Sequence, residues 1–294
     1  MDKKVIAVIG AAGFIGKAIS RELGKSHEVI GTSLHNREGY FHCDITKKSS
    51  VKDFISGHRP DVVIHLAALT DVDLCERDKA NAKKIHVDGT RNLVDACKSL
   101  SPRFIYFSTD FVFDGRKGNY SEADATNPIN NYGKTKLEGE KIAEALSGHL
   151  IVRASTPYSV GSGSKKFLGI LLEKLSRGEK AGAFADFIRS PTLIENLAEN
   201  VGALVSNGHS GVLHVTGSSQ LSMYDAALQV ADVFGFDPSL VQKTTSSSVS
   251  LDAPRPLDTG MNVSLARKLG LNIISFREGL LKVKKQAQGY IERH

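Results

Sequence analysis

The sequence is poor in cysteine and in long apolar runs, and it has no tryptophan. Three of its 294 residues are cysteines, Cys43, Cys75 and Cys97, and they form neither a Cys-x-x-Cys pair nor a cluster with histidines. This spacing excludes the common zinc motifs and a disulfide framework. We therefore expect no metal site and a reducing, cytoplasmic location.

The apolar and basic segments do not indicate a membrane or nucleic-acid partner. The first apolar segment starts at Val5 and ends at Gly10, which is too early for a signal peptide or a membrane span. The net charge is +6, but Lys and Arg are scattered without a strong basic block. We expect a soluble protein that binds neither membranes nor nucleic acid. A phosphorylated small molecule accounts for the positive surplus equally well.

The apolar pattern predicts an α/β protein with a doubly wound parallel Rossmann sheet and a smaller C-terminal substrate lobe. Short runs rich in Val and Ile alternate with segments of helical spacing, as in a buried parallel sheet. We place the Rossmann domain at 1–155, with segments near 193–217 returning to it, and the substrate lobe mainly at 156–294. Strands are expected at 5–9, 27–33, 41–46, 62–69, 103–110, 150–154 and 211–217, and helices at 17–23, 50–57 (capped by Ser49), 79–100, from 132, 167–175, 193–205 and 223–234 (capped by Ser222).

A glycine-rich turn follows the first strand. Gly10, Gly13 and Gly16 are spaced as in a variant of the dinucleotide-binding fingerprint, with Phe14 and Ile15 between the last two. Gly10 permits a tight turn, Gly13 lets a pyrophosphate approach the backbone, and Gly16 allows the helix to pack closely on the strand. These five residues therefore predict a dinucleotide site, because a strand precedes them and a helix follows.

The end of the second strand favours NADP over NAD, with NAD still possible. Ser33 and Arg37 stand where a carboxylate would bind the free 2′-hydroxyl of NAD, and this pair suits a 2′-phosphate better. Arg37 is otherwise a solvated loop residue. The remaining candidates for cofactor contact are Asp44 and Ile45, beside the adenine, and the small residues that end the fourth strand, Leu66, Ala67 and Ala68.

Tyr132 and Lys136 begin the helix that follows the fifth strand. Residues four apart share one helix face, so we expect the Lys136 ammonium to lie near the Tyr132 phenol and lower its pKa. Thr109 ends the fifth strand at the same sheet edge as the glycine turn. A Tyr-x-x-x-Lys spacing alone also occurs by chance in many helices.

Together these motifs resemble the extended short-chain dehydrogenase/reductases, and within them the dTDP-4-dehydrorhamnose reductase group. The resemblance rests on the glycine turn, on Leu66-Ala67-Ala68, on the segment 108–115 and on the segment 132–140. It implies a catalytic triad of Thr109, Tyr132 and Lys136, in which Tyr132 is the general acid and Lys136 also binds the nicotinamide ribose. It further implies that Thr70, Asp110 and Val112 line the sugar.

Basic residues for a nucleotide diphosphate are Arg255, Arg189 and the pair Lys165–Lys166, with Arg255 the best candidate. Three positions depart from the family pattern. His86 replaces a frequent Asn, which bears on a proton-relay water or leaves a packed helix histidine. The segment Ser155-Thr156-Pro157-Tyr158 follows the sixth strand, where an aromatic residue or Trp is frequent, and Phe111 stands where Tyr is common.

The expected function is NADPH-dependent reduction of a 4-keto group on a nucleotide-diphospho-deoxysugar, and a homodimer is a possible assembly. Two alternatives stay open. A sugar-nucleotide epimerase or dehydratase would retain tightly bound NAD. A dinucleotide-binding regulatory subunit, resembling the β subunit of methionine adenosyltransferase, could keep the same triad without turnover.

Overall fold

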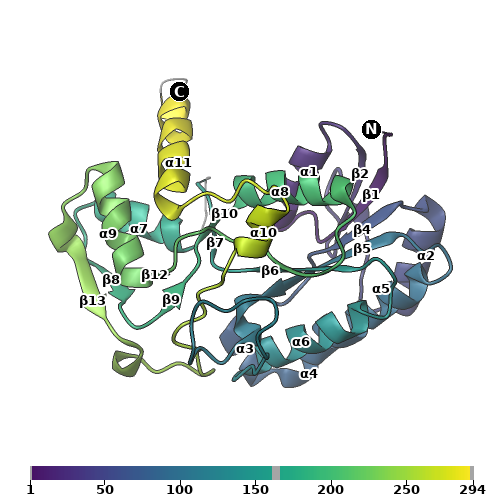
Figure 1. Ribbon diagram of the computed structural model, residues 1–294, viewed down its shortest axis with the longest axis horizontal. Coiled ribbons are helices and arrows are strands. Elements are labelled where there is room, and N and C mark those ends of the chain that lie inside the picture. Colours follow the sequence, from purple (N-terminus) through teal and green to yellow (C-terminus); the bar gives the residue numbers. More distant parts are fainter. Residues whose placement is uncertain (1, 161–165, 292–294) are drawn as a thin grey trace.

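The computed structural model describes residues 2–160 and 166–291, with side chains described as far as residue 286 (Figure 1). Lys165, one of the residues predicted to bind the diphosphate, lies outside these residues. Among them, the main sheet has seven strands, all paired in parallel. In spatial order they are β3 (Phe41–His42), β2 (Glu28–Ser33), β1 (Val5–Ile9), β4 (Val62–His65), β5 (Arg103–Thr109), β6 (Leu150–Ala154) and β11 (Gly211–His214). The order 3-2-1-4-5-6 is that of a doubly wound Rossmann sheet and confirms the predicted fold class.

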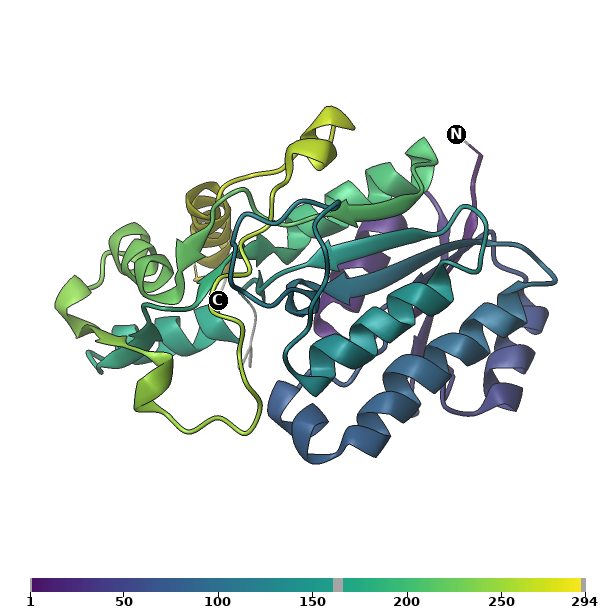
Figure 2. The same ribbon diagram turned by 60° about the horizontal axis from the view of Figure 1, so that its bottom comes forward.

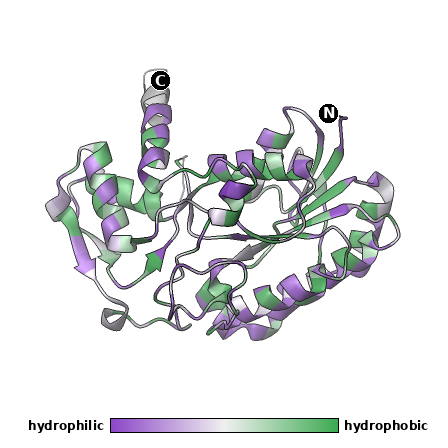
Figure 3. Cartoon of the chain, in the orientation of Figure 1, coloured by the Kyte–Doolittle hydropathy of each residue, from purple (hydrophilic) through white to green (hydrophobic). Residues whose placement is uncertain are grey.

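Helices cover both faces of this sheet (Figures 1 and 2). On one face lie α1 (Phe14–Leu23), α8 (Ile194–Asn207) and α10 (Ser264–Lys268), and on the other α2 (Lys48–His58), α5 (Gly89–Cys97) and α6 (Asn131–Ala143). Alternate residues of β1 supply the two cores: Ile6 and Val8 face α1, while Ala7 and Ile9 face α2 and α5. Figure 3 shows helices α5 and α6 with hydrophobic and hydrophilic residues interleaved, as expected for helices with one buried side.

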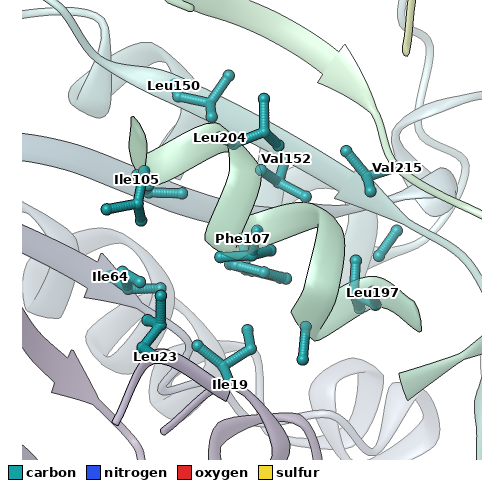
Figure 4. Close-up of a cluster of buried hydrophobic side chains, with 14 of the residues drawn as sticks. Ile19, Leu23, Ile64, Ile105, Phe107, Leu150, Val152, Leu197, Leu204 and Val215 are labelled. Atoms are coloured by element: carbon teal, nitrogen blue, oxygen red, sulfur yellow. The ribbon is translucent and has the colours of Figure 1, made fainter. Parts of the chain in front are cut away.

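The first core packs helix against sheet through large aliphatic side chains (Figure 4). Leu23 of α1 and Leu204 of α8 are fully or almost fully buried beside Ile64 of β4 and Val152 of β6. Burial of one such side chain contributes roughly 1.5–3 kcal/mol. This packing holds the strands in register and fixes where their carboxyl ends lie.

A smaller lobe has its own hydrophobic core. It contains α7 (Phe167–Ser176), α9 (Met223–Phe234), α11 (Phe276–Ile291) and the paired strands β8 (Ala181–Phe184) and β13 (Val241–Thr244). Two further strand pairs connect it to the main sheet: β7 (Pro157–Tyr158) with β10 (Thr192–Leu193), and β9 (Ile188–Arg189) with β12 (Leu221–Ser222). The predicted cap of α9 is confirmed, because Ser222 Oγ accepts the Asp225 N–H at 3.0 Å.

Several predicted boundaries are wrong. Ser49 does not cap α2 but lies inside it, because the helix starts at Lys48. A short helix that was not predicted, α3 (Val72–Arg77), follows the segment predicted as a strand at 62–69 and is capped by the Asp71 carboxylate. The helix predicted at 79–100 is interrupted: α4 (Lys79–Lys83) and α5 flank a π-helical turn, η1 (Lys84–Asp88). Short 3₁₀ turns occur at η2 (Asp110–Val112), η3 (Pro238–Leu240) and η4 (Ser246–Ser248).

The described part of the chain contains no helix with the length and apolar character needed to cross a membrane.

The approach of α1 to β1 gives a first prediction. A Cβ atom on Gly16 would lie 2.4 Å from Gly10 O and 2.8 Å from Ala11 Cα. Because both neighbours are backbone, we expect Gly16→Ala to lower the free energy of unfolding by about 1–3 kcal/mol, as overpacking does. Gly57, exposed in α2 with nothing within 4 Å of such a Cβ, is the matched control. Gly57→Ala should stabilise by about 0.5–1 kcal/mol. Urea unfolding measures both, and an unchanged midpoint for Gly16→Ala would contradict the close packing.

Candidate active site

A cleft of about 750 Å³ opens at the carboxyl ends of β1, β2, β4 and β5. Its volume is that of a typical small-ligand site. It brings together most of the residues singled out from the sequence: Gly10, Gly13, Phe14, Ile15, Gly16, Ser33, Arg37, Asp44, Ile45, Leu66, Ala67, Ala68, Thr70, Thr109, Asp110, Tyr132 and Lys136. The glycine turn and the Tyr132 helix therefore share one cavity.

The glycine turn has the geometry that a dinucleotide requires. Gly10 has φ +87°, and a Cβ there would lie 2.9 Å from Ala67 N. Its N–H donates to Thr32 Oγ1 at 3.2 Å. Gly13 is the N-cap of α1, so no side chain caps this helix. An uncapped helix N-terminus beside a cleft is an anion site, and these residues fit the pyrophosphate of a dinucleotide.

Neutral and basic side chains surround the end of β2. Ser33, His35 and Arg37 line the cleft there. The nearby Asp44 carboxylate is used within its own turn, where it accepts from Thr46 N at 3.0 Å and from Thr46 Oγ1 at 2.7 Å. This end of the cleft can accommodate an extra phosphate.

Its own cap and contacts with two other segments hold the N-terminus of α6. Asn130 caps the helix by accepting the Gly133 N–H at 2.8 Å, and Asn131 Nδ2 donates to Cys75 O at 2.8 Å. A Cβ on Gly133 would lie 2.1 Å from Phe111 O, so the helix meets this backbone at a distance that only glycine permits. Tyr132 is thereby placed at the cleft.

The Tyr132 ring is held edge-on between two other rings. Its centroid lies 5.9 Å from that of Phe111 and 5.7 Å from that of His86. Burial raises the pKa of the phenol above its ordinary value, although a hydrogen-bonding interaction with the Thr109 hydroxyl opposes the shift. Tyr132 is therefore protonated at neutral pH.

Lys136 lies on the same helix face as Tyr132, but its ammonium group is not directed at the Tyr132 phenol as predicted. Its Nζ donates to Phe107 O at 2.6 Å and lies 4.2 Å from the centre of the Tyr106 ring. Burial lowers the pKa of Lys136 to about 7, against the attraction of Glu140. The expectation that the ammonium lowers the Tyr132 pKa is wrong for this structure, because the cation is directed at a carbonyl of β5.

Beneath Lys136, one turn further along α6, lies a buried ion pair that sequence reasoning missed. Glu140 accepts from Arg153 Nε at 3.0 Å and from Arg153 Nη2 at 2.7 Å, and the Ser108 hydroxyl also donates to it. Two features of the sequence could have indicated this pair. Glu140 stands four residues after Lys136, and Arg153 is a charged residue inside an apolar strand. The pair ties α6 to β5 and β6.

Asp110 and Val112 differ from their predicted roles in the sugar site. Asp110 lines the cleft, but its carboxylate already accepts three hydrogen bonds. The donors are the hydroxyl groups of Thr109 at 3.1 Å, Ser155 at 2.9 Å and Thr259 at 2.5 Å. Val112 is fully buried in a hydrophobic cluster away from the cleft lining. The predicted substrate contact of Val112 is therefore wrong.

The predicted diphosphate residues also differ in position. Arg255 is not among the cleft residues, because its Nη2 pairs with the Asp73 carboxylate at 2.8 Å. Arg189 lines the cleft, but its guanidinium donates to three backbone carbonyls, those of Ile188, Pro256 and Leu257, at 2.7–2.8 Å. Lys166 lines the cleft and is exposed.

Thr156 and Pro157 also line the cleft, and neither was selected as a site residue. Thr156 has φ +39°, which is unusual for a β-branched side chain. Local sequence patterns carry no signal for such a conformation. Within residues 2–160 and 166–291, no three His, Cys, Asp or Glu side chains converge in a way that would hold a metal ion.

The sequence matches the family described as RmlD substrate binding domain over residues 3–288. The chain belongs to this family. The RmlD match and the reductase-like fold confirm the resemblance to the dTDP-4-dehydrorhamnose reductase group of the extended short-chain dehydrogenase/reductases.

The proteins similar to this chain include dTDP-sugar reductases and methionine adenosyltransferase subunits. A dTDP-4-dehydrorhamnose reductase of Mycolicibacterium smegmatis is 32% identical over 282 residues, which cover 94% of this chain and 83% of the relative. Methionine adenosyltransferase 2 subunit beta of Danio rerio is 29% identical over 288 residues, covering 92% and 86%. The crystal structure of a Bacillus anthracis dTDP-4-dehydrorhamnose reductase in complex with NADP superposes with a TM-score of 0.88 at 27% identity, covering 97% and 100%.

The buried Lys136 gives a second prediction. Its pKa is about 7 in the folded protein and about 10.4 when unfolded. Between these values the unfolded chain binds more protons, so the stability of the wild type rises with pH by up to about 1.4 kcal/mol per unit. Lys136→Met lacks this dependence. Its stability relative to the wild type should be highest below pH 7 and should decline towards pH 10, as measured by urea unfolding at several pH values. A difference that does not vary with pH would contradict the lowered pKa.

Proposed function

We propose that this protein is an NADPH-dependent reductase of a 4-keto group on a nucleotide-diphospho-deoxysugar, of the dTDP-4-dehydrorhamnose reductase type. The observation that carries the proposal is the convergence of Thr109, Tyr132 and Lys136 in the cleft that begins at the glycine turn. The reductases among its relatives support the substrate class.

The chemistry divides among these three side chains. NADPH, when bound, supplies the hydride that the ketone carbon receives. Tyr132 donates a proton to the ketone oxygen, and its raised pKa keeps that proton in place at neutral pH. The Thr109 hydroxyl, which donates to Asp110 Oδ1 at 3.1 Å in this structure, would turn to donate a hydrogen bond to the same oxygen as negative charge develops there. Lys136, whose Nζ donates to Phe107 O, lines the cleft and would also hold the nicotinamide ribose.

We infer NADP as the preferred cofactor, with NAD as the weaker ligand. Gly10, Gly13, Phe14, Ile15 and Gly16 would hold the pyrophosphate. Ser33 and Arg37 would hold the 2′-phosphate, because Arg binds phosphate with two parallel donors. The relative from Bacillus anthracis was crystallised with NADP, which supports this preference.

For the sugar nucleotide, the proposed contacts are Thr70, Thr109 and Lys166. Lys166 replaces Arg255 as the candidate for the diphosphate, because it lines the cleft and is exposed. We place the substrate lobe mainly in residues 156–294. The three cysteines are free thiols and buried, which supports a reducing, cytoplasmic location.

The direct experiment follows NADPH oxidation with dTDP-4-keto-6-deoxysugars as substrates. Turnover with at least one of them is the expected result. If none is reduced although NADPH binds, the substrate class is wrong.

Replacing the general acid gives a third prediction. Tyr132→Phe removes the transferable proton, so we expect kcat to fall about 10²- to 10⁴-fold while the Kd of NADPH stays within about twofold. Tyr224→Phe, on α9 and outside the cleft lining, is the control and should turn over like the wild type. Stopped-flow kinetics and a fluorescence titration measure the two quantities. Retained turnover in Tyr132→Phe would assign the proton to another acid.

The second candidate function is a dinucleotide-binding regulatory subunit, and the likeness to methionine adenosyltransferase 2 subunit beta supports it. NADP binding without turnover, together with co-purification of a larger partner enzyme, would favour this function. An epimerase would instead contain tightly bound NAD. Its cycle begins by removing a proton from a sugar hydroxyl, a step that a phenol of raised pKa does not favour.

A further inference from the structure

His86 is buried at the centre of the π-helical turn η1 and touches three parts of the site. Its Nε2 lies 3.0 Å from Leu69 N, and its Nδ1 lies 2.8 Å from Thr135 Oγ1. Its ring meets the Tyr132 ring edge-on, at 5.7 Å between centroids and an interplanar angle of 76°. Single π turns inside α-helices are frequent at functional sites.

The Leu69 backbone N–H favours the Nδ1–H tautomer of His86. This N–H is directed at Nε2 at 3.0 Å, which requires a nitrogen without a hydrogen. The Thr135 hydroxyl then accepts the Nδ1 proton and donates its own to Asn131 O at 2.9 Å or Tyr132 O at 3.1 Å. In the opposite tautomer, Thr135 would donate to Nδ1 and Nε2 would donate to Leu69 O, which lies 3.1 Å away.

Both ring nitrogens are thus engaged. Burial, together with the nearby Lys136, lowers the pKa of His86 to about 3, so the ring is neutral. The single N–H of the ring is directed at Thr135 and away from any ligand. A role for His86 in proton relay does not fit this arrangement.

The two partners of His86 lie on two different segments, both of which contribute residues to the cleft. Leu69 follows β4, lines the cleft and is followed by Thr70, the proposed sugar contact. Thr135 lies one turn after Tyr132 in α6. Gly139 permits the contact between α6 and this turn, because a Cβ there would lie 2.1 Å from Tyr106 Oη and 3.3 Å from His86 O.

We propose that His86 is a positioning residue that ties the Leu69–Thr70 wall of the cleft to helix α6, and so sets where the sugar lies relative to Tyr132. This inference rests on the proposed reductase function. The Leu69 amide is the contact that fixes the wall, and the Thr135 hydroxyl and the Tyr132 ring fix the histidine. Misplacement of a substrate by about 1 Å costs on the order of a hundredfold in rate.

Three substitutions separate the contacts. Gln reaches the position of Nε2, so His86→Gln keeps an acceptor for the Leu69 N–H. Asn reaches only the position of Nδ1, so His86→Asn keeps the bond to Thr135 and loses the bond to Leu69. His86→Ala loses both.

Two measurements on the full chain test the proposal. Hydrogen exchange of the Leu69 amide should accelerate in His86→Asn and His86→Ala, and should stay close to the wild type in His86→Gln. The KM for a dTDP-4-keto-6-deoxysugar, measured with saturating NADPH, should rise about tenfold or more in the same two variants and change less than about threefold in His86→Gln. The Kd of NADPH should be unchanged in all three.

The outcomes are distinguishable. An equal KM in His86→Gln and His86→Asn, or a KM that rises without faster Leu69 exchange, would overturn the proposal. A merely structural role would reduce the thermal midpoint and the active fraction without this correlation. If the wild type reduces no sugar nucleotide, the proposed function fails, while Leu69 exchange still decides whether His86 holds the wall.

Discussion

Helix α6 buries a lysine and a glutamate against the central sheet, and the candidate site depends on how these two charges are satisfied. The Lys136 ammonium donates to Phe107 O of β5, and the Glu140 carboxylate binds Arg153 of β6. A buried pair of charges is costly unless both members are hydrogen-bonded. These hydrogen bonds therefore fix how α6 packs on the sheet. They also fix the position of Tyr132, which lies in the first turn of the helix.

This packing also shifts the pKa values of three side chains at the cleft in different directions. Burial raises the pKa of the Tyr132 phenol, lowers that of Lys136 to about 7 and lowers that of His86 to about 3. At neutral pH the phenol keeps its proton and the histidine is uncharged. Tyr132 therefore offers its phenol proton to the cleft from this helix, which is the state that the proposed carbonyl reduction requires.

The sequence predicts what is local and periodic. The glycine spacing, the order of the apolar strands and the shared face of Tyr132 and Lys136 all follow from repeats of two or of about four residues. The residue with which a side chain interacts does not follow from such repeats. Arg255 pairs with Asp73, which lies 182 positions away in the chain. Lys136 was placed on the correct face, but helix spacing cannot identify an acceptor on a neighbouring strand.

Short turns were a second source of error. Asp110 begins a 3₁₀ turn, which directs Val112 into the cluster of Phe113 and Tyr120 rather than into the cleft. The apolar run that ends in polar residues was visible in the sequence, but the change of direction at its end was not. The same holds for Thr156, whose left-handed backbone costs roughly 1–2 kcal/mol and depends on its surroundings.

The cations of the cleft bear on how substrate is held. The guanidinium of Arg189 donates to three carbonyls of the chain, so it offers charge to a diphosphate without the paired donors that make arginine selective. The exposed Lys166 is a flexible point charge and is screened by salt. In the proposed function, these two cations would therefore fix the position of a diphosphate less strictly than α6 fixes the position of Tyr132. In the proposed reductase, selectivity among sugars would rest on Thr70, Thr109 and Thr156, which line the cleft.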